Sequence, residues 1–402
     1  MGLIRSLTTV YRSSLSGLPR EVWLLSGALL VNRAGTMVLP FLTLYLTIDL
    51  GLTAVRAGQI IGCFGLGSMV GSYAGGWLSD RMSPLRVQQG SLFASGVGFL
   101  VFTRLESFGS LAVGIFVLAA VSDALRPALM VAVAHYSPPE VSKRSFALIR
   151  LAANLGMGVG PAIAGLLAHY SYFWLFVGDA ATCWMAGLML VFAFGAGVRP
   201  PEDESGEAAP LGRSPWRDGP FLLFLLLIMV LAMTFFQVWT AMPLFLRAFY
   251  GASERAIGLL LSINALLIAL TEMLVIRAVE HFDALRTVGV GAFLVGAGLA
   301  LLPLGPPYAI AVAAMVILTV GEMLAMPISN TVVAQRAGRG QVGRYMGIYT
   351  LAFSAAFVVG PVAGTAVYEH FGPNALWFGV GGVGVFLGLG FTSLSKSLRR
   401  KV

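Results

Sequence analysis

The chain has 402 residues, of which 57% are hydrophobic and only 11% are charged, and its formal net charge is +8. Soluble globular proteins carry about 25% charged residues, so this composition argues against a soluble enzyme or binding domain. The two cysteines, Cys63 and Cys183, fall inside apolar segments and outside any metal-ligand spacing, which argues against a disulfide framework. A positive charge is compatible with nucleic acid or with a membrane, and its placement decides between them.

Charge-poor apolar runs of about 20 residues, the length that crosses a hydrocarbon core of about 30 Å, follow one another along the chain. The first 20 residues lack a signal-peptide pattern and are expected to form a cytoplasmic tail. We therefore predict an all-α membrane protein. Its twelve transmembrane helices are expected over residues 22–47, 57–78, 86–104, 109–134, 145–168, 173–196, 220–246, 256–277, 287–304, 308–330, 345–368 and 375–395.

Most of the 26 Lys and Arg residues fall in loops on one side when the N-terminus is placed inside. Basic residues gather in cytoplasmic loops, so this bias predicts that both termini are cytoplasmic and accounts for the charge without nucleic acid. The longest loop, 199–219, is rich in Pro, Glu, Asp and Gly and predicts a flexible cytoplasmic linker. We expect a monomer in a bacterial-type inner membrane.

A shift of 200 residues superposes features of the second half on those of the first. Parallel repeats of membrane helices leave this kind of trace. The matched pairs are Gly58 with Gly258, Asp80 with Glu280, Arg86 with Arg286, Pro127 with Pro327, Arg144 with Arg344, and Gly160-Pro161 with Gly360-Pro361. The register predicts two pseudo-symmetric six-helix bundles, residues 1–198 and 220–402.

The loop after the second span, from Gly76 through Asp80 and Arg81 to Arg86, resembles the Gly-x-x-x-Asp-Arg-x-Gly-x-x-Arg loop of the major facilitator superfamily, although Ser83 stands where Gly is usual. The resemblance covers the whole chain and implies secondary transport. Charges on this side, with Arg144 included, are candidates to close a cytoplasmic gate in the outward-open state. For Arg81 the alternative is a simple role in topology.

The fifth span carries Gly156, Gly160, Pro161 and Gly165, similar to a signature of proton-coupled antiporters in this superfamily. The alternative is ordinary packing of a bent helix through small residues. Two other stretches, Asn32 to Thr36 and Gly321 to Met323, look like the twelve-span drug:proton antiporter branch. Similarity to the oligopeptide branch is weaker, because only Asn32-Arg33 stands where an acidic cluster is usual.

Ionisable groups at bilayer depth are costly and are functional candidates by default. Glu322 and Glu272 have no charged neighbour within a helical turn, so we predict that they couple protons or bind a cationic substrate. The alternative for each is a structural ion pair across the bundle, for example with Arg33 or Arg126. Arg33, Asp123 and Arg126 belong to the same set of candidates for proton coupling or substrate binding. Asp123 lies one turn from Arg126, which favours a pair between them that switches partners during transport. Asp179 is expected to be a satisfied residue near the outer surface.

Polar, aromatic and Met side chains near mid-span predict a mainly apolar, adaptable cavity, although such residues are equally ordinary in helix packing. The candidates for its lining are Asn32, Phe236, Gln237, Trp239 and Met323. The chain has no Gly-x-x-x-x-Gly-Lys-Ser/Thr loop for ATP and no nucleophile with a convincing base.

The predicted function is therefore proton-coupled export of apolar or amphipathic small molecules by alternating access. It needs a proton gradient, a small-molecule substrate and a lipid bilayer, but no cofactor, metal or catalytic residue. Import of peptides or metabolites by proton symport is the alternative.

Overall fold

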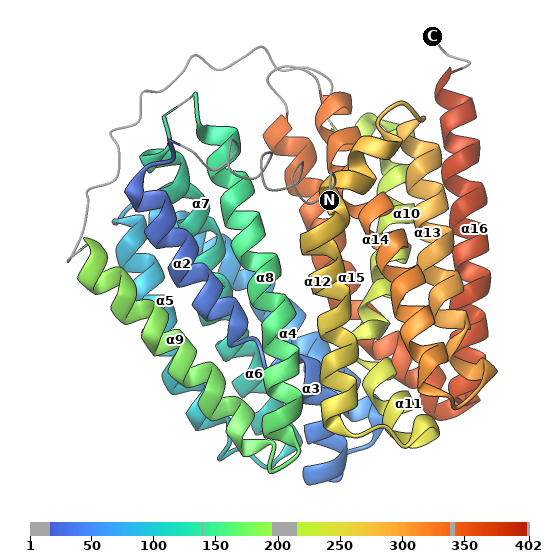
Figure 1. Cartoon of the computed structure of the whole chain (residues 1–402), viewed down its shortest axis with the longest axis horizontal. Helices are drawn as coiled ribbons and strands as arrows, with labels where there is room; N and C mark the ends of the chain where they lie inside the picture. Colours follow the sequence, from blue (N-terminus) through green and yellow to red (C-terminus); the bar gives the residue numbers. More distant parts are fainter. Residues whose placement is uncertain (1–16, 139, 195–214, 338–341, 400–402) are drawn as a thin grey trace, which may run out of the picture.

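The computed structural model describes residues 17–138, 140–194, 215–337 and 342–399. Their regular structure is helical and forms two groups that lie side by side (Figure 1). The first group comprises α2 (Arg20–Ala34), α3 (Val38–Leu44), η1 (Tyr45–Asp49), α4 (Ala54–Ser79), α5 (Pro84–Phe102), α6 (Phe108–Asp123), α7 (Leu125–Tyr136), α8 (Ser142–Ala168) and α9 (Phe173–Phe194). The second comprises η2 (Pro215–Arg217), α10 (Gly219–Phe235), η3 (Phe236–Val238), α11 (Ala241–Tyr250), α12 (Glu254–Val279), α13 (Ala284–Ala300), η4 (Leu302–Leu304), α14 (Tyr308–Ala337), α15 (Val342–Phe371) and α16 (Pro373–Arg399). We call these groups the first and second halves.

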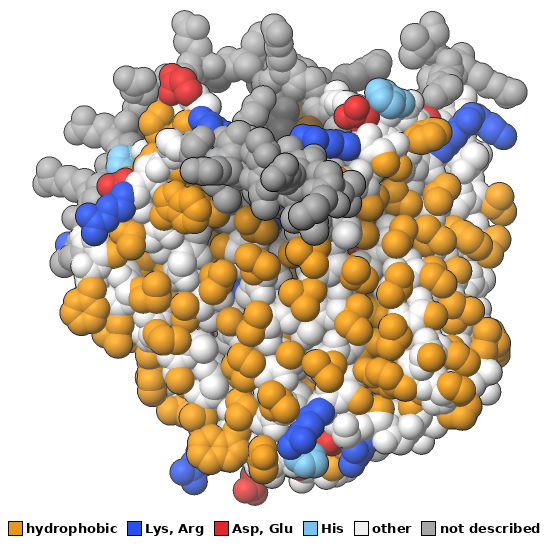
Figure 2. Space-filling view, viewed as in Figure 1, with side chains coloured by type: hydrophobic (Ala, Val, Ile, Leu, Met, Phe, Trp, Pro, Cys, Tyr) orange, Lys and Arg blue, Asp and Glu red, His pale blue; other side chains and the backbone are white. Residues whose placement is uncertain are grey.

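Ten helical stretches in the described part of the chain are long and apolar enough to cross a membrane. Helices α4 and α5, of 26 and 19 residues, correspond to the remaining two of the twelve predicted spans. Both helices are continuous, but glycines and polar side chains interrupt their apolar sequences. Figure 2 shows hydrophobic side chains over the middle of the visible face and charged side chains towards its two ends. The prediction of an all-α membrane protein is confirmed, and the helices are consistent with twelve spans.

The expected linker, 199–219, lies mostly outside the described residues. Its described end forms η2, and Asp218 caps α10 by accepting a hydrogen bond from the Phe221 N–H. The same carboxylate holds Arg336 of α14 through two hydrogen bonds of 2.8 and 2.7 Å. The guanidinium of Arg336 lowers the pKa of Asp218, so this clamp at the start of the second half persists at neutral pH.

Two helices break inside the apolar layer at positions that are 200 residues apart. The first span breaks between α2 and α3, around Thr36, and the seventh breaks at η3, which begins at Phe236. Backbone groups released by a break need partners, because no water is present in hydrocarbon. Asp179 accepts hydrogen bonds from the N–H groups of Met37 (2.8 Å) and Val38 (3.2 Å) at the first break. Asp179 is thus satisfied, as expected.

Three apolar cores hold the helices together. We name the end of the molecule where α9 ends and α10 begins the linker side. One core near this side contains only first-half residues, such as Leu25 and Ile149, and another contains only second-half residues, such as Phe224 and Phe391. The largest core is shared and lies towards the opposite side, where Phe41 belongs to the same cluster as second-half side chains. The halves are therefore joined at the opposite side and have separate cores at the linker side.

Matched glycines bring the two halves into close contact. Gly58 of α4 faces the carbonyl oxygen of Pro361 in α15, and Gly258 of α12 faces the carbonyl oxygen of Pro161 in α8. A Cβ at either glycine would overlap that oxygen. Small residues allow membrane helices to approach in this way. Because each contact pairs one half with the other, residues that the 200-residue register matches occupy equivalent positions across the molecular pseudo-symmetry.

We predict that Gly258→Ala destabilises the protein, because its new methyl group collides with backbone rather than with a movable side chain. Overpacking of this kind costs about 1–3 kcal/mol. The melting temperature in detergent, followed by tryptophan fluorescence, should fall. Gly90→Ala is the matched control, since a Cβ there meets nothing within 4 Å. Equal melting temperatures for the two variants would contradict the close crossing of α8 and α12.

Candidate functional site

A cavity of about 380 Å³ lies between the halves, on the linker side of the shared core. It is bordered by the helix breaks of the first and seventh spans, which contribute Thr36 and Phe236. Pockets of about 300–1,000 Å³ hold small organic molecules. The cavity is therefore large enough for a small substrate.

The first half gives the cavity a charged wall. Asp123 and Arg126 form an ion pair with 3.5 Å between carboxylate Oδ1 and guanidinium Nε, and 62% of the Arg126 side chain remains exposed. The predicted Asp123–Arg126 pair is thus present in the structure. Arg33 lies on the same wall, and no hydrogen bond or ion pair joins its side chain to another described residue. Beside it, Asn32 donates a hydrogen bond to the sulfur of Cys183 (3.4 Å).

The facing wall is aromatic and comes mainly from the second half. Phe357 contacts Phe236 edge to face, with ring centroids 4.6 Å apart, and reaches Phe64 of the first half at 5.7 Å. Trp239 and Phe353 extend this surface along the cavity. The cavity consequently combines a charged wall with an apolar aromatic one.

Of the five residues expected to line the cavity, Asn32, Phe236 and Trp239 do so. The structure places the other two elsewhere. Gln237 is buried in the break of the seventh span, where its amide donates hydrogen bonds of 2.9 Å to the carbonyl oxygens of Met233 and Gly360. Met323 is buried and contacts the hydroxyl of Thr271 at 3.4 Å. Gln237 turns away from the cavity because its amide supplies the hydrogen bonds that backbone carbonyl groups need at the break.

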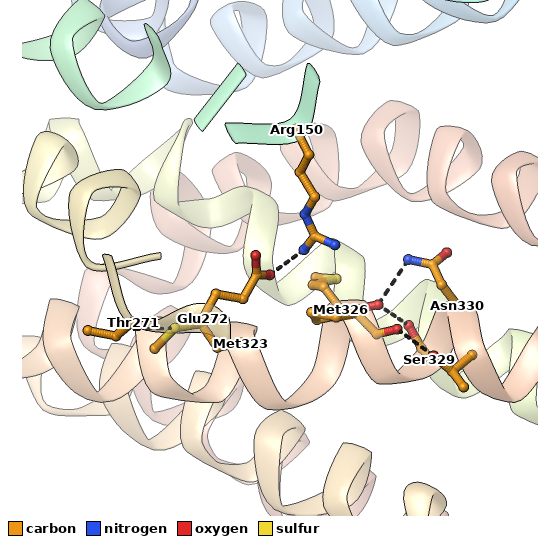
Figure 3. Close-up of polar contacts among 9 residues, drawn as sticks. Arg150, Thr271, Glu272, Met323, Met326, Ser329 and Asn330 are labelled. Atoms are coloured by element: carbon orange, nitrogen blue, oxygen red, sulfur yellow. Dashed lines mark hydrogen bonds and ion pairs between the residues drawn. The ribbon is translucent and has the colours of Figure 1, made fainter. Parts of the chain in front are cut away.

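The two candidate carboxylates lie outside the cavity lining, in the second half. Glu322 of α14 accepts a hydrogen bond of 2.8 Å from the Asn264 amide, which also contacts the Thr319 hydroxyl at 3.0 Å. Glu272 of α12 is buried and forms an ion pair with Arg150 of α8. In Figure 3 the Arg150 side chain points across from the first half to Glu272. Glu272 therefore lies at the boundary between the halves, whereas the hydrogen-bond partner of Glu322 belongs to the second half. We call these two carboxylates the acidic cluster.

A cross-bundle ion pair was one of the two interpretations considered for Glu272, with Arg33 or Arg126 as example partners. The structure gives Arg150 that position instead. Sequence reasoning assigned no role to Arg150, although a lone arginine inside a span is itself a functional signal. Asn264 and the aromatic residues Phe64, Phe353 and Phe357 were missed as well, because no motif marks them.

The predicted gate residues lie at the linker side. Asp80 is exposed and forms no ion pair with any other described residue, whereas Arg81 stacks on Trp77, 3.8 Å from the ring centroid. Arg86 is exposed at the start of α5, and Arg144 lies at the start of α8. Gly76 precedes them in α4, where a Cβ would only touch Pro127 at 3.9 Å. Because the halves have separate cores at this side, the gate remains a prediction for another conformation.

The Gly-Pro element of α8 contacts helices of both halves. Gly156 and Gly160 face the α2 backbone near Arg33, and Gly165 faces the backbone of Glu254 at the start of α12. Pro161 presents its carbonyl to Gly258, as described above. The element thus links the broken first span to the second half.

The described residues contain no group of three or more His, Cys, Asp or Glu side chains that could hold a metal ion. What the site offers chemically is charge, hydrogen-bond donors and aromatic surface. These groups suit reversible binding of a small molecule, and the acidic cluster offers carboxylates that can exchange protons.

Comparison with known proteins agrees with this architecture. The chain is 24% identical to a protein described as a Na(+), Li(+), K(+)/H(+) antiporter from Planococcus maritimus, over 90% of this chain and 91% of that protein. It is 23% identical to multidrug resistance protein MdtH of Aeromonas hydrophila, over 90% and 92% of the two chains. A crystal structure of a POT family transporter in complex with 5-aminolevulinic acid shares the fold, with a TM-score of 0.82, 15% identity and coverage of 95% and 97%.

The sequence profile of the Major Facilitator Superfamily matches residues 24–248 and again residues 224–401. The two matches together cover almost the whole chain, and the crystal structure of the POT family transporter covers 95% of it. The chain is therefore a membrane transporter that belongs to the Major Facilitator Superfamily.

Proposed function

We propose that this transporter uses an inward proton gradient to export apolar or amphipathic small molecules. The observation that carries the proposal is the location of Glu272 and Glu322. They lie outside the cavity lining, and Glu272 binds Arg150 of the other half at the boundary between the halves. A proton and a substrate can then act on one conformational equilibrium from two different sites.

The ion pair between Glu272 and Arg150 links protonation to the contact between the two halves. Protonation of Glu272 removes its negative charge and weakens its attraction to Arg150, so the contact between α12 and α8 loosens. Loss of the proton restores the pair. Glu322, hydrogen-bonded to Asn264 on the same helix as Glu272, belongs to the same cluster and responds to the same change. Alternating access then follows from two halves that rock about the close glycine crossings.

Three findings support export. The cavity lies on the linker side of the shared core, and the basic loops favour a cytoplasmic location for that side. The Gly-Pro element of α8 resembles the antiporter signature and packs between the broken first span and α12. One relative bears the description of a cation/proton antiporter and another that of a multidrug resistance protein. Together they favour antiport in an inner membrane with cytoplasmic termini.

The direction of proton movement tests this proposal. Liposomes containing the protein would start at equal pH on both sides, with a trapped pH dye and a potential clamped by potassium and valinomycin. Naphthalene-2-sulfonate or (naphthalen-2-ylmethyl)trimethylammonium is then added outside, since neither carries a proton by itself. Antiport predicts that the lumen becomes alkaline as probe enters and protons leave. Acidification of the lumen would instead establish symport, and an absent response with both probes would count against proton coupling.

We predict that Glu272→Gln and Glu322→Gln uncouple the probe from the proton. The lumen pH response should fall about tenfold or more, which corresponds to about 1.4 kcal/mol of lost coupling. Exchange of labelled probe between equal concentrations should continue, because the cavity is untouched. Glu106→Gln is the matched control, since Glu106 is exposed in a loop of the first half. An unchanged pH response in both variants would reject these carboxylates as the coupling site.

A further inference from the structure

The charged wall of the cavity contains one group that the protein leaves without a partner. Four charged residues line the cavity: Arg33, Asp123, Arg126 and Asp179. Asp179 is occupied by two backbone N–H groups, and Asp123 and Arg126 form an ion pair. Arg33 alone forms no hydrogen bond or ion pair with another described residue. Its guanidinium is therefore available to something inside the cavity.

A guanidinium in this position needs an acceptor. It carries five N–H donors, accepts no hydrogen bond and stays charged in proteins. Polar groups taken out of water without partners cost free energy, so a partly buried guanidinium next to a cavity favours an anionic ligand. Arg126, which reaches the same cavity, is close enough to Arg33 for the two positive charges to interact, and the Asp123 carboxylate is close enough to offset part of this repulsion. Because Asp123 is paired with Arg126, Arg33 is the guanidinium on this wall that has no described partner.

A cationic ligand would find no unoccupied carboxylate among the described residues of the cavity lining. Both carboxylates in the cavity lining are already occupied, and Glu272 and Glu322 lie outside it. The opposite wall, formed by Phe236, Phe357 and Trp239, offers aromatic surface instead. The ligand that matches both walls has an anionic head and an apolar body.

We propose that the cavity binds amphipathic organic anions, namely carboxylates or sulfonates. Arg33 is their principal head-group ligand, Arg126 is the second, and the aromatic wall receives the ring or chain. This proposal names a substrate class for the exporter and so rests on the proposed function for its physiological meaning. The binding itself requires only the cavity.

Binding to the full-length protein in lipid nanodiscs tests this assignment. Three probes share one ring system and differ in charge: naphthalene-2-sulfonate, (naphthalen-2-ylmethyl)trimethylammonium and naphthalen-2-ylmethanol. Calorimetric titration, corrected with empty nanodiscs, should show that the wild-type protein binds the sulfonate about tenfold or more tightly than the other two, as a charge-assisted contact predicts. Arg33→Gln should abolish this preference while the affinity for the alcohol stays the same. Arg33→Lys should retain part of it.

The matched control is Arg104→Gln, because Arg104 is exposed in a loop of the first half. Its preference should equal that of the wild type. If Arg33→Gln fails to fold, judged by thermal unfolding, Arg126→Gln supplies the same test and should weaken sulfonate binding selectively. The proposal is wrong if the wild type fails to bind the sulfonate, binds it no more tightly than the alcohol, or keeps its preference in the folded arginine variants.

This titration involves no gradient, so it separates the substrate class from the transport mechanism. A sulfonate preference in a protein that shows no proton exchange in liposomes supports the binding site and refutes only the proposed coupling. The opposite result is proton exchange that the cationic probe drives and the sulfonate does not. It would support the coupling and refute the anion site.

Discussion

A backbone group that leaves its helix inside a bilayer has no water to replace the lost hydrogen bond, and this constraint shapes the centre of the protein. The first and seventh spans both break beside the cavity. Asp179 satisfies the N–H groups of Met37 and Val38 at one break, and the Gln237 amide donates to two carbonyl oxygens at the other. The two polar side chains therefore serve the backbone, and the interrupted helices can border the cavity.

The remaining polar groups lie in two separate places. Arg33, Asp123 and Arg126 face the cavity from the first half, whereas Glu272 and Glu322 lie at the boundary of the second half. The contacts that join the halves include those of α8, which packs on the broken first span and on α12, and those of α4 with α15. A change at either site consequently acts on the same interface. In the proposed mechanism, this arrangement couples binding in the cavity to protonation of the cluster without shared ligands.

Hydropathy was enough to predict the helices, because an apolar run of this length depends only on local composition. The 200-residue register was enough to predict their pseudo-symmetry, because it is read directly from matched residues in the sequence. Gly58 and Gly258 illustrate this, since their match in sequence reappears as equivalent contacts with α15 and α8. The site was less predictable. Which cation reaches Glu272 depends on helix rotation and on packing between the halves, so Arg150 could not be selected from the sequence. Gln237 was expected in the cavity because its role at the helix break becomes visible only in three dimensions.

Alternating access about the glycine crossings is the central claim, and paired distances between spin labels test it most directly. In a variant without Cys63 and Cys183, one pair of labels replaces Met82 and Phe282 at the linker side, and another replaces Tyr170 and Phe371 at the opposite side, all of them exposed positions. When pH is lowered or substrate is added, double electron–electron resonance should show one distance shortening as the other lengthens. Distances that stay fixed, or that change together in the same direction, would contradict the account.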